Sequence, residues 1–260
     1  MGIHFLISQI VAGTALYVIQ RFFTKPVDVY YQNTILFTGI TALLAMIPAF
    51  FFYRKDRCRR KAGAVVSVQG QEKLSILETV LLFLAGAGLA QYGNSLVSLL
   101  NDLIREEVYQ ESMSRITEGK SLLMMIFWMG IVVPVAEEMI FRWLVYLRLR
   151  DYLSFAASVI ISGLIFGIYH GNIVQGIYAS LLGAAFAYLF EKSGNLYSSI
   201  LLHAGANIWS LFMTEYGQKI LSLKFGNIIW MDSYILLLIA MIGSFIYFSR
   251  KGADYDKRKI

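Results

Sequence analysis

The stretch Pro-Val-Ala-Glu-Glu-Met-Ile-Phe-Arg, from Pro134 to Arg142, places two adjacent carboxylates and a guanidinium inside an otherwise apolar segment. A charged side chain in hydrocarbon costs about 2.5–3.5 kcal/mol or more, and ionisable residues in such segments are usually functional. The stretch therefore indicates both a membrane protein and the position of its functional site.

The composition of the whole chain agrees with a membrane protein. Of the 260 residues, 57% are hydrophobic and only 15% are charged, whereas a soluble domain has about 25% charged residues. The basic residues behind the net charge of +6 cluster at the ends of apolar runs, where membrane topology requires them. We therefore expect a lipid bilayer, and no nucleic acid, around this chain. The single cysteine, Cys58, supports neither an internal disulfide nor a cysteine-based metal site.

The apolar runs predict an all-α fold, a polytopic bundle of about eight transmembrane helices. The predicted segments are 3–22, 34–53, 76–100, 121–150, 152–170, 173–190, 196–213 and 234–248. Pro134 should kink the fourth segment, because its ring clashes with the carbonyl four residues earlier. Small residues between 85 and 90 indicate close helix contact.

The segments group into three parts. Residues 1–120 hold N-terminal transmembrane helices and, from 101 to 120, an amphipathic connector. Residues 121–213 hold a core with the charged stretch, and residues 214–260 hold a C-terminal transmembrane helix and a basic tail.

Basic clusters predict the orientation. Residues 54–61 hold six basic residues in eight positions, which is typical of a cytoplasmic loop. Alternation then places the link with Arg148, the turn at Glu191 and the basic tail on the same side. Both termini are expected in the cytoplasm.

Four polar residues of three segments are predicted to meet. Counting about 1.5 Å per residue from the cytoplasmic ends places Glu137, His170, His203 and Asn207 at depths of roughly 12 to 24 Å. All four depths lie within the hydrocarbon, so we expect one shared, buried polar pocket.

Spacing along the charged stretch separates two glutamates with different roles. Glu138 and Arg142 are four residues apart and share a helix face, so they should form an ion pair. Glu137 points about 100° away and is left for chemistry. The alternative is a purely structural ion-pair network of all three side chains.

The later segments add two pairs with a spacing of four. Phe166 precedes His170, so its ring can pack over the imidazole. His203 and Asn207 face the same way and can both donate hydrogen bonds to one oxygen; an interhelical polar clasp is the alternative. We interpret His4, near the amino terminus, as an interfacial residue.

Two chemistries fit this set of residues. Glu137, positioned with His170, could take a proton from a water that attacks a carbonyl, while His203 and Asn207 stabilise the oxyanion. Glu137, His170 and His203 could instead bind Zn²⁺ and leave one coordination position open for water. The residues leave both alternatives open.

Together, Glu137-Glu138-x-x-x-Arg142, Phe166-x-x-x-His170 and His203-x-x-x-Asn207 resemble the CPBP family. This family includes type II CAAX prenyl proteases and the bacteriocin-processing or immunity proteins also called Abi. The resemblance implies that 121–213 is the catalytic core of an intramembrane glutamic endopeptidase. It also implies that Glu137 and His170 activate water and that His203 and Asn207 form the oxyanion hole.

We therefore expect a multi-pass bacterial plasma-membrane endopeptidase acting on a peptide or membrane-protein substrate. Because bacteria generally do not prenylate proteins, a bacteriocin or signalling-peptide precursor is favoured over a CAAX tail. One alternative is a non-enzymatic bacteriocin self-immunity or membrane scaffold protein of the same fold. Another is a proton-coupled transporter, which would be expected to carry inverted repeats that this chain does not show. The sequence specifies neither the substrate nor the oligomeric state.

Overall fold

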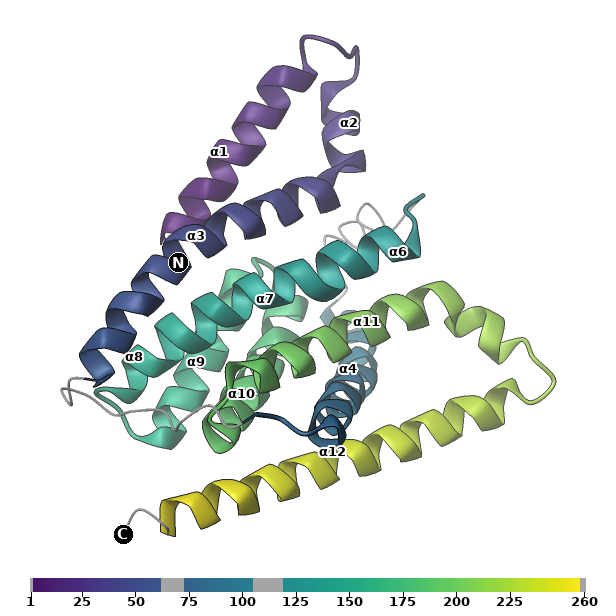
Figure 1. Cartoon of the computed structure of the whole chain (residues 1–260). Helices are drawn as coiled ribbons and strands as arrows, with labels where there is room; N and C mark the ends of the chain where they lie inside the picture. Colours follow the sequence, from purple (N-terminus) through teal and green to yellow (C-terminus); the bar gives the residue numbers. More distant parts are fainter. Residues whose placement is uncertain (1, 62–72, 105–118, 258–260) are drawn as a thin grey trace.

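A computed structural model describes residues 2–61, 73–104 and 119–257, and every regular element in these ranges is a helix (Figure 1). Eight helices are separate: α1 (Gly2–Ile19), α2 (Pro26–Gln32), α3 (Thr34–Lys61), α4 (Ile76–Ile104), α9 (Phe155–Tyr169), α10 (Ile173–Ser193), α11 (Leu196–Leu221) and α12 (Gly226–Lys257). Residues Leu122–Arg150 form one further continuous helix, which we call the site helix. Its successive parts are α6 (Leu122–Met125), the π-helical stretch η1 (Ile126–Val132), α7 (Val133–Glu138), the π-helical stretch η2 (Met139–Tyr146) and α8 (Leu147–Arg150).

The predicted helical membrane bundle is confirmed. Within the described ranges, six helices are long and apolar enough to cross a membrane: α1, α3, α4, the site helix, α10 and α12. The shorter α9 has 15 residues, or about 22 Å, which is less than a hydrocarbon core of about 30 Å. Six of the eight predicted segments correspond to these six helices, segment 152–170 corresponds to α9, and segment 196–213 corresponds to α11, which is not among the six. The number of complete crossings stays a prediction.

Several helices extend further into polar sequence than predicted. The basic segment 54–61, expected as a loop, is the end of α3. The residues between the predicted segments 196–213 and 234–248 are helical except for residues 222–225. Apolar residues delimit only the part of a helix that can lie in hydrocarbon. The helix itself can extend into water where side-chain pairs stabilise it, as the pair of Glu215 and Lys219 does. Most of the amphipathic connector predicted at 101–120 lies outside the described residues.

The site helix lies between two groups of helices (Figure 1). On one side it contacts α3, against which α1 packs, and on the other it contacts α11, which packs closely on α4. A Cβ atom at Gly86 of α4 would lie 2.0 Å from the Leu202 carbonyl oxygen of α11. Only glycine permits this approach, so the predicted close contact at 85–90 is confirmed and fixes the helix that carries His203.

Charged residues join the basic segments at one end of the bundle. The pairs are Arg148 with Asp56 at 2.7 Å, Arg60 with Asp151 at 2.7 Å, Arg150 with Glu191 at 2.9 Å and Lys251 with Glu78 at 2.7 Å. The ends of α3, the site helix, α10 and α12 therefore share one side, as alternation predicted.

The start of α1 does not reach this basic end. Ile7 packs against a cluster that includes Ala45, Ala49 and Ile140, which lie in the middle of α3 and of the site helix. His4, expected at an interface, therefore reaches into the bundle beside the charged stretch.

Candidate active site

The charged stretch lies in the middle of the site helix and faces α11. Glu138 and Arg142 are fully buried, and His203 of α11 is 5% exposed. The side chain of Glu137 is 15% exposed and is the more accessible of the two glutamates. The predicted convergence of segments four and seven is therefore present.

A π-helical stretch accommodates Pro134 without interrupting the helix. The N–H of Val133 donates to the carbonyl of Trp128, five residues earlier. In this register the Met129 carbonyl would be paired with the N–H of residue 134, which proline lacks. Asn207 of α11 donates its Nδ2–H to that carbonyl at 2.8 Å. Asn207 thus satisfies a backbone group that Pro134 leaves without a donor.

Glu138 lies between a guanidinium and an imidazole. Its Oε2 is 2.9 Å from Nε of Arg142, so the predicted ion pair is present. Its Oε1 is 2.9 Å from Nδ1 of His203. The Arg142 guanidinium also lies over the rings of Phe166 and Phe186, at 5.0 and 5.4 Å. These aromatic faces help to compensate a cation that is removed from water.

His203 also faces Glu137, with Nε2 3.6 Å from Oε2. Since Glu138 is paired with a cation and accepts only, Nδ1–H of His203 donates to it. If Glu137 were ionised and His203 neutral, Nε2 of His203 and the Glu137 carboxylate would both be acceptors facing each other. The site would then carry a net charge of −1. Net buried charge is strongly disfavoured, so we expect the Glu137–His203 pair to hold one proton. Such a pair is suited to proton transfer.

His170 is anchored by its own helix turn. Its Nδ1–H donates to the Phe166 carbonyl at 2.8 Å, and the two rings lie 4.8 Å apart. The Phe166 ring also contacts His203, at 5.7 Å. Both imidazoles therefore pack on one phenyl ring, but among the described residues Glu137 has its ion-pair contact with His203 and none with His170.

The described residues do not fit the suggested zinc site. No three His, Cys, Asp or Glu side chains in the described ranges lie close enough to hold a metal ion. Both nitrogens of His203 face glutamates, and His170 is not grouped with Glu137.

A cavity of about 240 Å³ opens on Glu137. Tyr169 of α9 and His4 of α1 also line it, together with residues of α2 and α3. Neither residue was predicted to belong to the site. No spacing signal marks Tyr169, and the position of His4 near the amino terminus suggested an interface.

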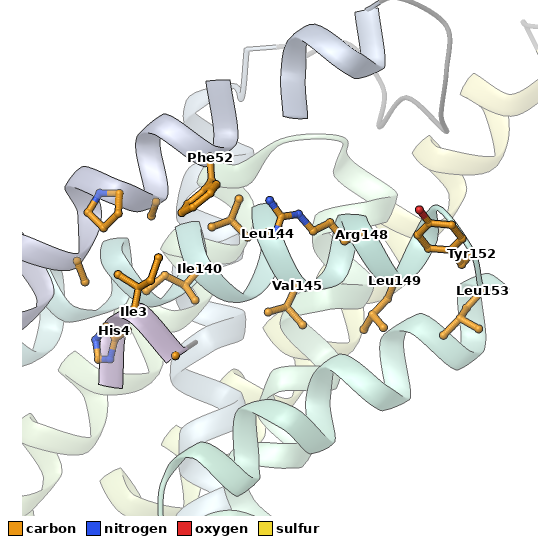
Figure 2. A pocket seen from close by; sticks show the side chains of 14 residues that line it. Ile3, His4, Phe52, Ile140, Leu144, Val145, Arg148, Leu149, Tyr152 and Leu153 are labelled. Carbon is orange, nitrogen blue, oxygen red and sulfur yellow. The ribbon is translucent and has the colours of Figure 1, made fainter. Parts of the chain in front are cut away.

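A second, larger cavity adjoins the first at His4, which lines both. It measures about 690 Å³ and is mainly apolar, between α3 and the site helix. Figure 2 shows Ile3 and His4 at one end of this cavity and Tyr152 and Leu153 at the other. Its size is within the range of about 300–1,000 Å³ that is usual for ligand pockets.

Comparisons with known proteins match the region of the chain that contains these residues. Residues 119–209 match the model of the family described as Type II CAAX prenyl endopeptidase Rce1-like. The chain is also 23% identical, over 151 residues, to a Bacillus subtilis (strain 168) protein named "Putative membrane peptidase YdiL". That alignment covers 56% of this chain and 61% of the relative, which is less than two thirds of its length. No solved structure gives a significant match. These matches confirm the resemblance to CPBP membrane proteases at the family level.

Proposed function

We propose that this chain is an intramembrane endopeptidase that hydrolyses a peptide bond in a membrane-associated peptide or protein. One observation carries the proposal. The Glu137 carboxylate lines a cavity and lies 3.6 Å from His203, whose other ring nitrogen is held by Glu138. A carboxylate that shares a proton with an oriented imidazole, beside space for substrate, is the arrangement that general acid–base hydrolysis needs.

In the proposed reaction, a water in the cavity attacks the carbonyl carbon of the scissile bond. Glu137 accepts one proton from that water as the new carbon–oxygen bond forms. It then gives the proton to the amide nitrogen, so the carbon–nitrogen bond breaks to a carboxylic acid and an amine. The His203 imidazolium balances the negative charge of Glu137 and of the transition state.

His170 and Asn207 keep the roles that the family resemblance implies. The Nδ1–H of His170 is engaged by Phe166, which leaves Nε2 to orient the attacking water. Asn207 uses one of its two Nδ2 hydrogens on Met129, which leaves the second for the oxyanion. The adjoining 690 Å³ cavity, with its apolar wall, suits a substrate with apolar side chains near the cleaved bond.

The variant Glu137→Gln tests the proposal. The amide keeps the size of the side chain but cannot accept a proton, so cleavage should fall by about 10²–10⁴-fold. The measurement is a comparison of membrane peptidomes from cells with wild-type protein, with Glu137→Gln, and with Glu215→Gln as a matched control. Glu215 is an exposed residue paired with Lys219 on α11, remote from the charged stretch in sequence.

We expect a set of peptides that is present with the wild-type and Glu215→Gln proteins and absent with Glu137→Gln. Equal levels of the three proteins in detergent extracts show that the loss is chemical. Identical peptidomes with wild-type and Glu137→Gln proteins would remove the endopeptidase assignment.

A further inference from the structure

Two polar side chains outside the three sequence motifs face the Glu137 cavity together. A hydrogen bond joins His4 Nδ1 of α1 to the Tyr169 hydroxyl of α9. Their rings meet edge to face, with centroids 5.3 Å apart. Both side chains line the 240 Å³ cavity on which Glu137 opens.

The position of Tyr169 is set by packing on the site helix. Its ring lies 5.4 Å from Phe141, which is four residues beyond Glu137. Glu137 lines the same cavity as Tyr169 and His4. The hydroxyl is therefore held beside the proposed base by two contacts, one apolar and one polar.

The donors already assigned to the site are largely occupied. Both nitrogens of His203 face glutamates, at 2.9 and 3.6 Å. Asn207 donates one of its Nδ2 hydrogens to the Met129 carbonyl. Hydrolysis nevertheless develops negative charge on the carbonyl oxygen of the substrate, and that charge requires donors aimed at it.

We propose that Tyr169 is a further catalytic residue, whose hydroxyl donates a hydrogen bond to that carbonyl oxygen, and that His4 is its positioning residue. In this arrangement Nδ1–H of His4 donates to the Tyr169 oxygen, so the phenolic hydrogen is directed to the substrate. The donor stays neutral throughout, and no additional proton is consumed. This inference rests on the endopeptidase function proposed above.

A structural role makes a different prediction. If the hydrogen bond only ties α1 to the bundle, its loss should lower stability and leave turnover per folded molecule unchanged. The two roles are separated by measuring kcat, KM and thermal unfolding for the same variants.

The experiment uses the full chain in lipid nanodiscs and a synthetic peptide from the Glu137-dependent set. Tyr169→Phe removes the hydroxyl and keeps the ring on Phe141. His4→Ala removes the positioning donor, whereas His4→Asn retains a donor near the position of Nδ1. Tyr197→Phe, at an exposed tyrosine of α11, is the matched control.

We expect Tyr169→Phe to lower kcat by about 10²-fold, as loss of one oxyanion donor does, with KM changed much less. His4→Ala should lower kcat in the same direction, His4→Asn should recover part of it, and Tyr197→Phe should match wild type. If Tyr169→Phe does not fold, the proposal is tested by the two His4 variants: a higher kcat for His4→Asn than for His4→Ala supports it, and equal wild-type values overturn it.

Two negative results have different meanings. If Glu137→Gln abolishes cleavage but Tyr169→Phe and His4→Ala turn over at the wild-type rate, only the role of Tyr169 and His4 is overturned. If Glu137→Gln itself leaves cleavage intact, both the proposed function and this inference fail.

Discussion

At the scale of single residues, the site is a buried network with balanced charge. The charges of Glu138 and Arg142 cancel, and the one proton expected on the Glu137–His203 pair would cancel the charge of the second carboxylate. Neutrality explains how four ionisable groups can be buried together, because a net charge in a medium of low dielectric constant is costly. It also explains why a second glutamate is needed: one orients the imidazole and the other is left to react.

Breaking the ion pair should destabilise the protein strongly. Glu138→Gln leaves the fully buried Arg142 without a counter-charge, and loss of one partner of such a pair costs about 3–5 kcal/mol. The measurement is the free energy of unfolding in mixed micelles of increasing denaturing detergent. A loss well below 1 kcal/mol would contradict the assigned charges.

A double variant separates stability from activity. Replacing both partners, with Glu138→Leu and Arg142→Met, removes the buried charges together and should recover much of the lost stability. It should not recover cleavage, because His203 then lacks the oxygen that orients Nδ1. A double variant that is both stable and active would show that Glu138 is not needed for orientation.

At the scale of elements, two helices are coupled through one hydrogen bond. The widened turn before Pro134 brings the Met129 carbonyl to a position that Asn207 of α11 can reach. The bond holds α11, and with it His203, at a fixed register on the site helix. Pro134 therefore helps to position the site residues. π-Helical stretches are frequent at functional sites.

Asn207→Ala should lower stability by about 1–3 kcal/mol, because it leaves a buried carbonyl without a donor. Pro134→Ala supplies an N–H at that position in the π register, so the double variant should regain stability. The measurement is thermal unfolding of both single variants and the double variant. If Pro134→Ala gives no rescue, the register assignment at Met129 is wrong.

Activity of the same double variant tests the second role of Asn207. If the remaining N–H of Asn207 contributes to the oxyanion hole, cleavage should stay about 10²-fold low although stability returns. Recovery of both properties would assign Asn207 to structure alone.

The hairpin of α9 and α10 sets the depth of His170. Gly171 adopts φ of +79°, which suits glycine, and the Asn172 side chain caps α10 by accepting from the N–H of Gln175. The tight turn ends α9 after 15 residues, beside the middle of the site helix. Tyr169 therefore lies at the level of Glu137, in the same cavity, and His170 follows it in the chain.

At the scale of the whole molecule, the charges divide the bundle into a basic end and an apolar body. Charged pairs at the basic end join α3, the site helix and α10 with one another and α12 with α4, while many large apolar residues elsewhere are exposed, as lipid contact requires. The excess of basic residues predicts that this end faces the cytoplasm.

The single cysteine tests that orientation. Cys58 is exposed near the basic end of α3, so a membrane-impermeant maleimide should label it in inverted vesicles and not in intact cells. The opposite labelling pattern would reverse the topology.

A relocated cysteine provides the control. In a protein with Cys58→Ser and Ser121→Cys, the thiol lies at the exposed start of the site helix, beyond the opposite end. It should be labelled in intact cells.

Much of the site could be predicted because its signals are local. The ion pair of Glu138 and Arg142 and the packing of Phe166 on His170 follow from a spacing of four residues on one helix. For Glu137 and His203, only a similar depth in the membrane was predicted. Residue counting gives the depth of a side chain along its helix, but it does not give the direction in which the side chain faces a neighbouring helix. An interhelical polar clasp at His203 and Asn207 was the alternative interpretation, and the structure shows one; that Asn207 bonds to Met129 was not predicted, because this carbonyl is available only in a π-helical register that residue patterns do not show.

Apolar runs and isolated charges were sufficient to indicate a membrane bundle, its basic end and the stretch that carries the chemistry. The free-energy cost of burying a charge is a property of the single residue, so it can be inferred without the tertiary structure. Helix packing decided which nitrogen meets which carboxylate, and it brought His4 across more than 160 residues of sequence to Tyr169. Such contacts arise from the relative position of separate helices, and no single segment encodes them.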